Sequence, residues 1–186
     1  MMMRSAILVD ESNAMEQLHE IGIFGFKRWS VFYRTIEQIL AHSYGNVEVS
    51  QRMYSACPSK QMDIERHYRR LRFFNALRKD GIFVRQGNMY TINGELYQKG
   101  VDMLIGLDLY ELSLNSVPLL FLFSSDGDFI PAIEKAQENG SHVIAVVSNH
   151  RSADIMRQAV DEVVSLESLI ECIPEREIII HNPVVA

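Results

Sequence analysis

The chain has 186 residues, 47% of them hydrophobic and 23% charged, which is enough apolar material to close the core of one globular domain and excludes a disordered chain. Its longest apolar run, at 117–123, is about a third of the roughly 20 residues that a membrane-spanning helix needs. The N-terminus is too short for a signal peptide, and the two cysteines, Cys57 and Cys172, lack the spacing of a disulfide framework or a zinc site. We therefore expect a cytoplasmic protein with no membrane partner.

The net charge of −6 is unevenly distributed along the chain. Residues 60–85 hold eight basic and three acidic side chains, so this segment is positive while the remainder is strongly acidic. A basic patch of this kind can hold a phosphate backbone near an acidic site, although a solvated helix face would have the same composition. The patch includes Arg66, Arg69 and Arg70, which we take as candidate contacts to the backbone of a nucleic acid.

In the first half of the chain, apolar periodicity predicts alternating strands and helices. A continuous apolar run over 5–9 is typical of a strand buried on both faces. The elements predicted after it are a short helix with a loop over 11–25, a helix over 29–42, a strand over 47–56, an amphipathic helix with a basic face over 64–79, a strand over 82–85, and a second extended piece over 89–92 with a turn at 93–94.

The second half continues the alternation, with predicted helices over 98–114, 128–139, 152–158 and 166–172 and predicted strands over 118–123, 142–147 and 162–164. Because strands and helices alternate through short loops, we predict an α/β fold. It is a three-layer, Rossmann-like domain over residues 1–172, with a mostly parallel central sheet flanked by helices. The tail, 173–186, contains an apolar run at 178–180, and we expect it to be an added edge strand or a packing arm, with an arm in a homodimer as a further alternative.

Acidic side chains follow two of the predicted strands. Asp10 ends the first strand, and Asp126 and Asp128 follow the strand at 118–123. Open parallel sheets bind ligands at the carboxyl ends of their strands, and carboxylates supply the oxygen ligands that Mg²⁺ and Mn²⁺ prefer. Aspartate is also common at helix caps and turns, so each one alone has a structural explanation, whereas the three together predict a metal site.

A fourth acid for this site is expected from the helix predicted at 98–114. Asp102, near its start, can reach the same strand ends, and Lys99 can reach a phosphate or hold the carboxylates in place. Asp108 lies six residues later, roughly 600° round the helix, so it should face elsewhere. Asp108 therefore has at most an indirect role in the site, and a charged residue on a helix is the simpler interpretation.

The order of these motifs resembles the NYN domain family, and within it the LabA-like group of bacterial proteins, also called DUF88. The resemblance runs from about residue 6 to residue 169. It is carried by four segments in this order: Ile7-Leu-Val-Asp10-Glu-Ser-Asn13, Gln98-Lys-Gly-Val-Asp102-Met-Leu-Ile-Gly-Leu-Asp108, Phe123-Ser-Ser-Asp126-Gly-Asp128-Phe129-Ile-Pro131, and Gly140 before His142-Val-Ile-Ala-Val-Val147.

This resemblance implies a PIN-like fold and a metal-dependent ribonuclease site. The residues that it implies as catalytic, and as ligands of Mg²⁺ or Mn²⁺, are Asp10, Asp102, Asp126 and Asp128. Asn13 and Lys99 are implied as contacts to the substrate. Ser125 is assigned to the substrate as well, at a position where the family pattern usually has glycine.

We therefore predict a metal-dependent ribonuclease that hydrolyses the phosphodiester bonds of RNA, single-stranded rather than duplex. The basic helix would follow the RNA backbone, and Tyr90 and Tyr97 are candidates for stacking on unpaired bases. One alternative is a non-catalytic RNA-binding or regulatory module with the same fold. A second, with less support, is a phosphohydrolase of small phosphate esters, because the Asp-x-Asp pair that haloacid-dehalogenase-like enzymes carry after the first strand is missing.

Overall fold

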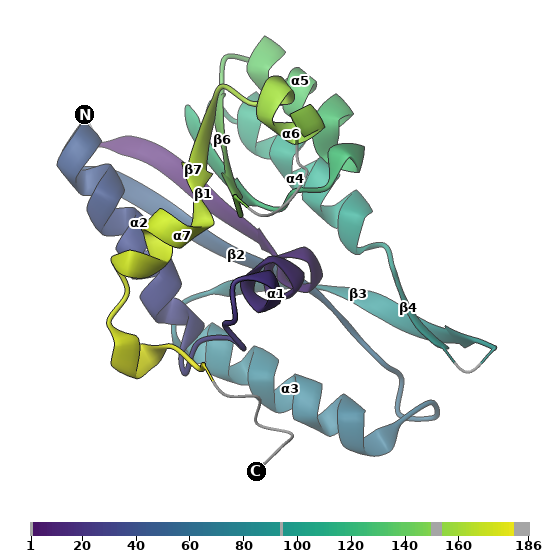
Figure 1. Ribbon diagram of the computed structural model, residues 1–186. Helices are drawn as coiled ribbons and strands as arrows, with labels where there is room; N and C mark the ends of the chain where they lie inside the picture. The colour runs from purple at the N-terminus through teal and green to yellow at the C-terminus, as the bar shows by residue number, and fades with distance from the viewer. Residues whose placement is uncertain (1, 94, 150–153, 181–186) are drawn as a thin grey trace.

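The computed structural model describes residues 2–93, 95–149 and 154–180, and within them seven strands form one sheet in the order β4-β3-β2-β1-β5-β6-β7 (Figure 1). Every pair of neighbouring strands is parallel except β3 and β4, which form an antiparallel hairpin. The strands are β1 (Met3–Asp10), β2 (Val47–Cys57), β3 (Phe83–Ile92), β4 (Glu95–Lys99), β5 (Leu119–Phe123), β6 (His142–Val147) and β7 (Glu162–Ser165).

Helices cover both faces of the sheet (Figure 1). One face carries α1 (Glu11–Glu20), α2 (Trp29–Tyr44), α3 (Ile64–Lys79) and α7 (Leu166–Glu171), and the other carries α4 (Val101–Leu114), α5 (Ile130–Glu138) and α6 (Asp154–Ala159). Two single turns of 3-10 helix are η1 (Gly127–Phe129) and η2 (Glu175–Glu177). The prediction of a three-layer α/β fold with a mostly parallel sheet is confirmed.

The central strands are buried on both faces, as the continuous apolar runs predict. In β1, Ile7 and Val9 belong to the core beneath α1, α2 and α3, while Ala6 and Leu8 belong to the core beneath α4 and α5. All five residues of β5 are buried. The two cores therefore clamp the centre of the sheet from both sides and hold the carboxyl ends of β1 and β5 in a rigid frame.

The direction of winding reverses at β1. From β1 the chain builds β2 and β3 on one side of it and later returns to place β5, β6 and β7 on the other. Val9 and Phe123 are paired in the register of β1 and β5, so α1, which follows β1 directly, and the loop after β5 leave the sheet side by side. Ligands of open α/β sheets bind at such a switch point, where diverging loops leave a crevice.

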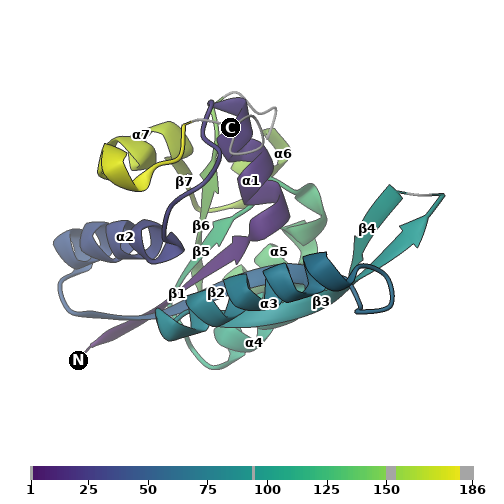
Figure 2. The ribbon, with the colours of Figure 1, turned by 90° about the horizontal axis from the view of Figure 1, so that it is seen from below.

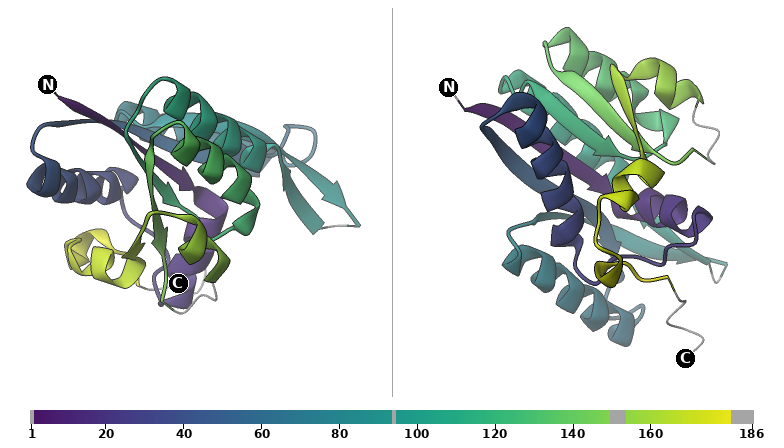
Figure 3. Two further views of the ribbon diagram at one scale, coloured as in Figure 1. Left: turned by 90° about the horizontal axis from the view of Figure 1, so that it is seen from above. Right: turned by 60° about the vertical axis from the view of Figure 1, so that its left-hand side comes forward.

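The region around residues 82–99 differs from the prediction. The two extended pieces expected at 82–85 and 89–92 form the single strand β3. Residues 95–99 add the strand β4, of which residues 98–99 were expected to begin the helix. Gly87 allows this, since a Cβ there would lie 2.7 Å from a methyl group of Val101. Gly100, with a φ of 84°, ends β4 and starts α4. The hairpin extends from the body of the molecule (Figures 2 and 3), and Gly94 of the expected turn lies outside the described residues.

Other elements agree with the prediction within a few residues. The helix expected at 128–139 is divided into η1 and α5, with Pro131 in the first turn of α5. The helix expected at 152–158 is described from Asp154 onward, and residues 152–153 lie outside the described residues. No helix of the described segments is both long enough and apolar enough to cross a membrane.

The described part of the tail, residues 173–180, packs against the loop after α1. Ile178 forms an isolated antiparallel bridge with Phe26, and the amide of Phe24 donates a hydrogen bond of 2.7 Å to the carbonyl of Ile179. Through residue 180 the tail is therefore not an added edge strand of the seven-stranded sheet. Its alternative role as an arm in a homodimer stays a prediction, and residues 181–186 lie outside the described residues.

Candidate active site

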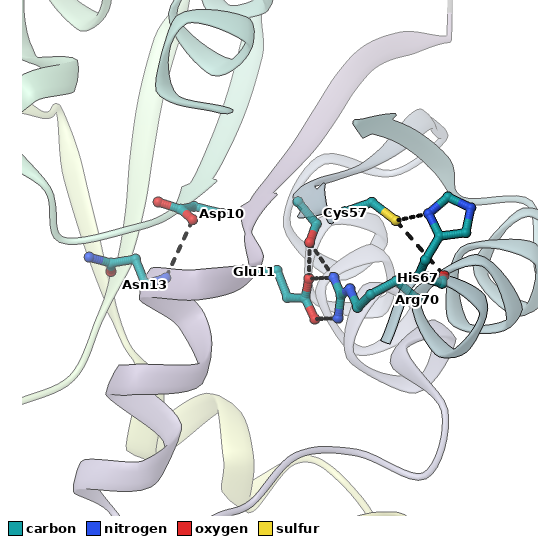
Figure 4. A network of polar contacts seen from close by, with 7 residues as sticks. Asp10, Glu11, Asn13, Cys57, His67 and Arg70 are labelled. Atoms are coloured by element: carbon teal, nitrogen blue, oxygen red, sulfur yellow. Dashed lines mark hydrogen bonds and ion pairs between the residues drawn. The ribbon is translucent and has the colours of Figure 1, made fainter. Parts of the chain in front are cut away.

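Asp10 is the last residue of β1 and caps α1. Its Oδ1 accepts a hydrogen bond from the backbone amide of Asn13 at 3.3 Å, and its Oδ2 accepts one from the hydroxyl of Ser124 at 3.4 Å (Figure 4 shows the first). Only 5% of the residue is exposed. Burial raises the pKa of the Asp10 carboxyl from 3.8 to about 6, and the negative charges of Asp102 and Asp126 add to the increase. The fold therefore positions the Asp10 carboxylate where its ionisation costs free energy.

The loop after β5 places its two aspartates differently. The Oδ1 of Asp126 accepts a hydrogen bond from the amide of Asp128 at 3.0 Å and caps η1, and the amide of Asp126 donates to the hydroxyl of Ser124 at 3.2 Å. Asp126 is half-buried and Asp128 is exposed. Ser124 contacts the carboxyl of Asp10 as well, so a single buried hydroxyl links the β1 and β5 ends of the site.

Asp102 lies in the first turn of α4, where the amide groups at the start of a helix favour a negative charge. Burial raises the pKa of its carboxyl, followed by the charges of Asp126 and Asp128. Asp10, Asp102 and Asp126, which come from three separate elements, are therefore close enough for their charges to interact. The prediction that the helix supplies an acid to the strand ends agrees with this placement.

A cavity of about 370 Å³ lies between α1, β4 and the loop after β5. Its lining includes three of the four predicted acids, Asp10, Asp102 and Asp126, together with Asn13 and the segment 96–98 of β4. Asp128 is not part of the lining, although its charge reaches Asp102. Glu16 of α1 lines the cavity as well, so four carboxylates share it, and no lysine or arginine of the described residues is part of the lining.

The donor set suits a hard divalent cation. Mg²⁺ is usually held by one or two carboxylates and several waters, and a cation among these acids would favour the ionised form of Asp10, whose pKa is raised by burial and, to a smaller extent, by the charges of Asp102 and Asp126. As the side chains are placed, no group of three His, Cys, Asp or Glu residues in the described part of the chain is close enough to hold a metal ion. The residues therefore fit a cation bound mainly through water, with one or two carboxylates in direct contact.

Asn13 holds the site together from α1. Its Oδ1 accepts hydrogen bonds from the amide of Ser125 at 2.9 Å, from the hydroxyl of Ser125 at 3.1 Å and from Nε2 of Gln17 at 2.8 Å. The fully buried Gln17 in turn accepts a hydrogen bond of 2.7 Å from the amide of Ser148, just after β6. This series of hydrogen bonds joins α1 to the loops after β5 and β6. Asn13 and Ser125, both predicted to contact substrate, are thus also part of the frame that positions Asp126.

Two of the predicted arginines border a second cavity of about 200 Å³, which shares Ser12, Glu16 and Gln98 with the first. Arg66 lines it without an ion pair of its own among those the structure records. The guanidinium of Arg70 is paired with the Glu11 carboxylate through both its terminal nitrogens, one at 2.9 Å, and contacts the hydroxyl of Ser55 (Figure 4). Arg70 is therefore held by the protein itself.

The remaining basic candidates lie further out. Arg69 is exposed on α3 and lines a separate shallow groove with Tyr68 and Arg72. Lys99 is the last residue of β4 rather than part of a helix, and its ammonium lies 6.0 Å from the ring centre of Tyr90. The sequence predicted Lys99 inside the helix at 98–114, whereas the structure places it on the hairpin, two residues before α4 begins.

Asp108 does not line the acidic cavity, in line with the prediction that it faces elsewhere than Asp102, but it is buried and paired. It is 1% exposed and accepts hydrogen bonds from Tyr54 Oη at 2.6 Å and Arg52 Nη1 at 2.8 Å, with Arg85 Nη2 at 2.9 Å. The face of α4 that carries Asp108 packs on β2 and β3, where the two arginines supply its counter-charges. Arg85 is thereby engaged away from the cavity, and the pairing could not be seen from the helix period.

A cysteine and a histidine lie beside the second cavity, with Cys57 Sγ 3.5 Å from His67 Nδ1 (Figure 4). The same Nδ1 lies 2.7 Å from the carbonyl of Pro58, which can only accept, so this nitrogen carries the proton and cannot act as a base toward the thiol. Burial also raises the pKa of the Cys57 thiol. The pair is not an activated nucleophile.

Sequence reasoning missed two parts of the site. Gln17 lies one helical turn after Asn13, and this i, i+4 spacing was a usable signal for a polar pair on one face of α1. The segment 96–98 reaches the cavity because β4 pairs with β3, and no periodic pattern in residues 95–99 announced that strand.

The fold and the acidic crevice define a PIN-like α/β domain with its site at the switch point of the sheet. The NYN domain family matches residues 4–167, and the chain belongs to this family, whose members have a nuclease-like fold.

No curated protein matches the chain. A crystal structure of a protein of unknown function from Vibrio parahaemolyticus matches 90% of this chain and 95% of its own, with 22% identity and a TM-score of 0.68, which supports the fold. A C-S lyase from Staphylococcus hominis covers 94% of this chain and 54% of its own at 10% identity and a TM-score of 0.26, too low for an argument.

Proposed function

We propose that this protein is a metal-dependent ribonuclease that hydrolyses phosphodiester bonds in single-stranded RNA. One observation carries the proposal: three carboxylates from β1, α4 and the loop after β5 line one open cavity of a NYN domain, with no lysine or arginine in that lining in the part of the chain that the structure describes. The motifs quoted above lead us to place the chain in the LabA-like group of that family. The proposed cofactor is Mg²⁺ or Mn²⁺, with Asp10, Asp102 and Asp126 as its holders and Asp128 as an outer charge.

When bound, such a cation supplies an activated water and stabilises the oxygen that leaves phosphorus. The residues of the chain prepare the place for this chemistry. Asp10 is ionised at neutral pH, because about 6 is still below pH 7, and the amide of Asn13 and the hydroxyl of Ser124 orient it. Asn13 fixes the loop that carries Asp126. These preset contacts reduce the reorganisation needed when the substrate phosphate enters.

The proposed path for RNA leads from the basic side of the molecule to the acids. Arg66 borders the second cavity, which joins the acidic cavity through three shared residues, and Arg69 extends the positive surface along α3. Contacts of this kind to phosphates make affinity fall steeply with salt. Arg70 is paired with Glu11, so in this proposal it forms part of the wall of the second cavity and does not bind a phosphate.

The test is cleavage of an end-labelled, unstructured RNA by the purified protein with Mn²⁺ or Mg²⁺, compared with EDTA. The Asp126→Asn, Asp128→Asn double variant is the test protein. The matched control is Asp161→Asn, at an exposed acid that lies near the start of β6, at the opposite end of the strand from the site. The proposal expects cutting that needs the cation, is lost in the double variant and is kept in the control. Equal cutting by the double variant, or cutting in EDTA, would contradict it.

A second function is favoured by one observation, namely that the acids of the described residues are not assembled into a three-ligand metal group. On this alternative the domain binds RNA without cutting it. Salt-sensitive RNA binding that the Asp126→Asn, Asp128→Asn change leaves intact, combined with no cleavage under any cation, would decide for the binding module.

A further inference from the structure

We propose that the β3–β4 hairpin is a stacking platform for unpaired bases, which holds a single strand of nucleic acid against the acidic cavity. The proposal deepens the function proposed above and rests on it for the nature of the substrate. It assigns the recognition of single strands to the paired rings of Tyr90 and Tyr97, which no part of the core requires.

The two rings form one exposed surface. Tyr90 and Tyr97 are directly opposite each other in the antiparallel register, their ring centres are 5.8 Å apart and the rings are inclined by 25°. They are 37% and 41% exposed, and all five residues of β4 are exposed. By contrast, most aromatic rings of α2 and β5 are buried in the core. A pre-stacked, solvent-facing pair is the arrangement that a base can extend by stacking on one more face.

The hairpin lies beside the acids. The segment 96–98, which includes Tyr97, lines the same cavity as Asp10, Asp102 and Asp126. A base that stacks on this surface therefore brings its neighbouring phosphates close to the carboxylates. Because the hairpin projects from the domain (Figure 2), a strand can approach it from solvent without displacing any helix.

The hairpin carries a cation at its α4 end, while the Glu95 carboxylate at the other end of β4 accepts a hydrogen bond of 2.8 Å from the Tyr97 hydroxyl. The ammonium of Lys99 lies 6.0 Å from the ring centre of Tyr90, on the strand that leads into α4 and the acid Asp102. It can hold a phosphate beside a stacked base. The combination of rings and one cation favours nucleic acid over an apolar peptide.

This platform discriminates by strandedness. In a duplex, each base is already stacked and paired, so its face is not available to a protein ring. In a single strand, the bases can turn outward and stack on aromatic side chains with little regard for sequence. The protein should therefore prefer unpaired segments and show only weak preference among bases.

The experiment measures binding rather than cutting. A dye-labelled, unstructured 12-nucleotide RNA is titrated by fluorescence anisotropy in EDTA, so that no cleavage can occur. The variants are Tyr90→Ala, Tyr97→Ala and the corresponding Phe substitutions. The matched control is Tyr44→Ala, a 48% exposed tyrosine at the end of α2, which lies at the opposite end of the strands. Circular dichroism verifies that each variant is folded.

We expect each Ala variant to weaken binding by roughly 5- to 150-fold, while the Phe variants and Tyr44→Ala stay within about twofold of the wild type. A hairpinned duplex of the same length should bind the wild type more weakly and show no dependence on the two rings. Wild-type affinity in the Ala variants overturns the proposal, as does an equal loss in the Phe variants, which would assign the effect to the hydroxyl groups.

The two measurements distinguish failure of the ribonuclease proposal from failure of the stacking platform. Ring-dependent binding without any metal-dependent cleavage supports the platform and removes the nuclease. Cleavage that is unaffected by the Ala variants, with unchanged binding, supports the nuclease and removes the platform.

Discussion

Asp10→Asn should stabilise the protein at neutral pH, although it removes a residue of the candidate active site. The folded protein holds the proton of Asp10 more tightly than the unfolded chain, because burial and the neighbouring acids raise its pKa from 3.8 to about 6. Ionisation therefore costs folding free energy. The cost is absent below pH 3.8, grows as the pH rises, and is complete above about pH 6. Asparagine cannot ionise and is itself a good helix cap.

The magnitude follows from the same values. At about 1.4 kcal/mol per pKa unit, the difference between 3.8 and about 6 comes to about 3 kcal/mol at pH 7.5. At pH 4.5 the same relation leaves about 1 kcal/mol, since the folded protein is then almost fully protonated at Asp10. The variant should thus gain about 2 kcal/mol more at pH 7.5 than at pH 4.5.

The assay is urea unfolding in EDTA, followed by the fluorescence of Trp29, the single and buried tryptophan of the chain. The matched control is Asp128→Asn, in the exposed part of the neighbouring loop, which should change stability by less than about 0.5 kcal/mol at either pH. Loss of stability in Asp10→Asn at pH 7.5, or an equal gain at both values of pH, would refute this account of the site.

Three further predictions concern the metal, the core and the frame of the site. Mn²⁺ at 100 times its dissociation constant should raise the free energy of unfolding by about 2.7 kcal/mol, as measured by thermal melts, and the rise should vanish in an Asp10→Asn, Asp126→Asn double variant. Asp108→Ala should cost about 3 kcal/mol in urea unfolding, because it leaves two partly buried guanidinium groups without their carboxylate; a cost below about 1 kcal/mol would contradict this role. Gln17→Leu should cost about 1–3 kcal/mol and slow RNA cleavage, since it removes the hydrogen bonds of Gln17 to the amide of Ser148 and to Oδ1 of Asn13, which holds the loop of Asp126; unchanged stability would count against the frame.

Local pattern in the sequence was enough for most of the fold. The helix over residues 64–79 and the strand over 142–147 have the bounds that their apolar spacing predicts, because period and breakers are properties of adjacent residues. The alternation of such elements also implies parallel pairing in a three-layer domain. The positions of Asp10 and Asp126 followed from the same logic, since both come directly after apolar strands.

Tertiary structure alone decided which side chains meet. β4 exists because it pairs with β3, and this pairing moves Lys99 from a helix to the hairpin and brings the segment 96–98 to the cavity. Asp108 is buried because two arginines from β2 and β3 neutralise it, which no helix period records. Arg70 is held by Glu11, 59 residues away along the chain. Such contacts depend on packing between distant segments, so they become visible only once the sheet has placed those segments side by side.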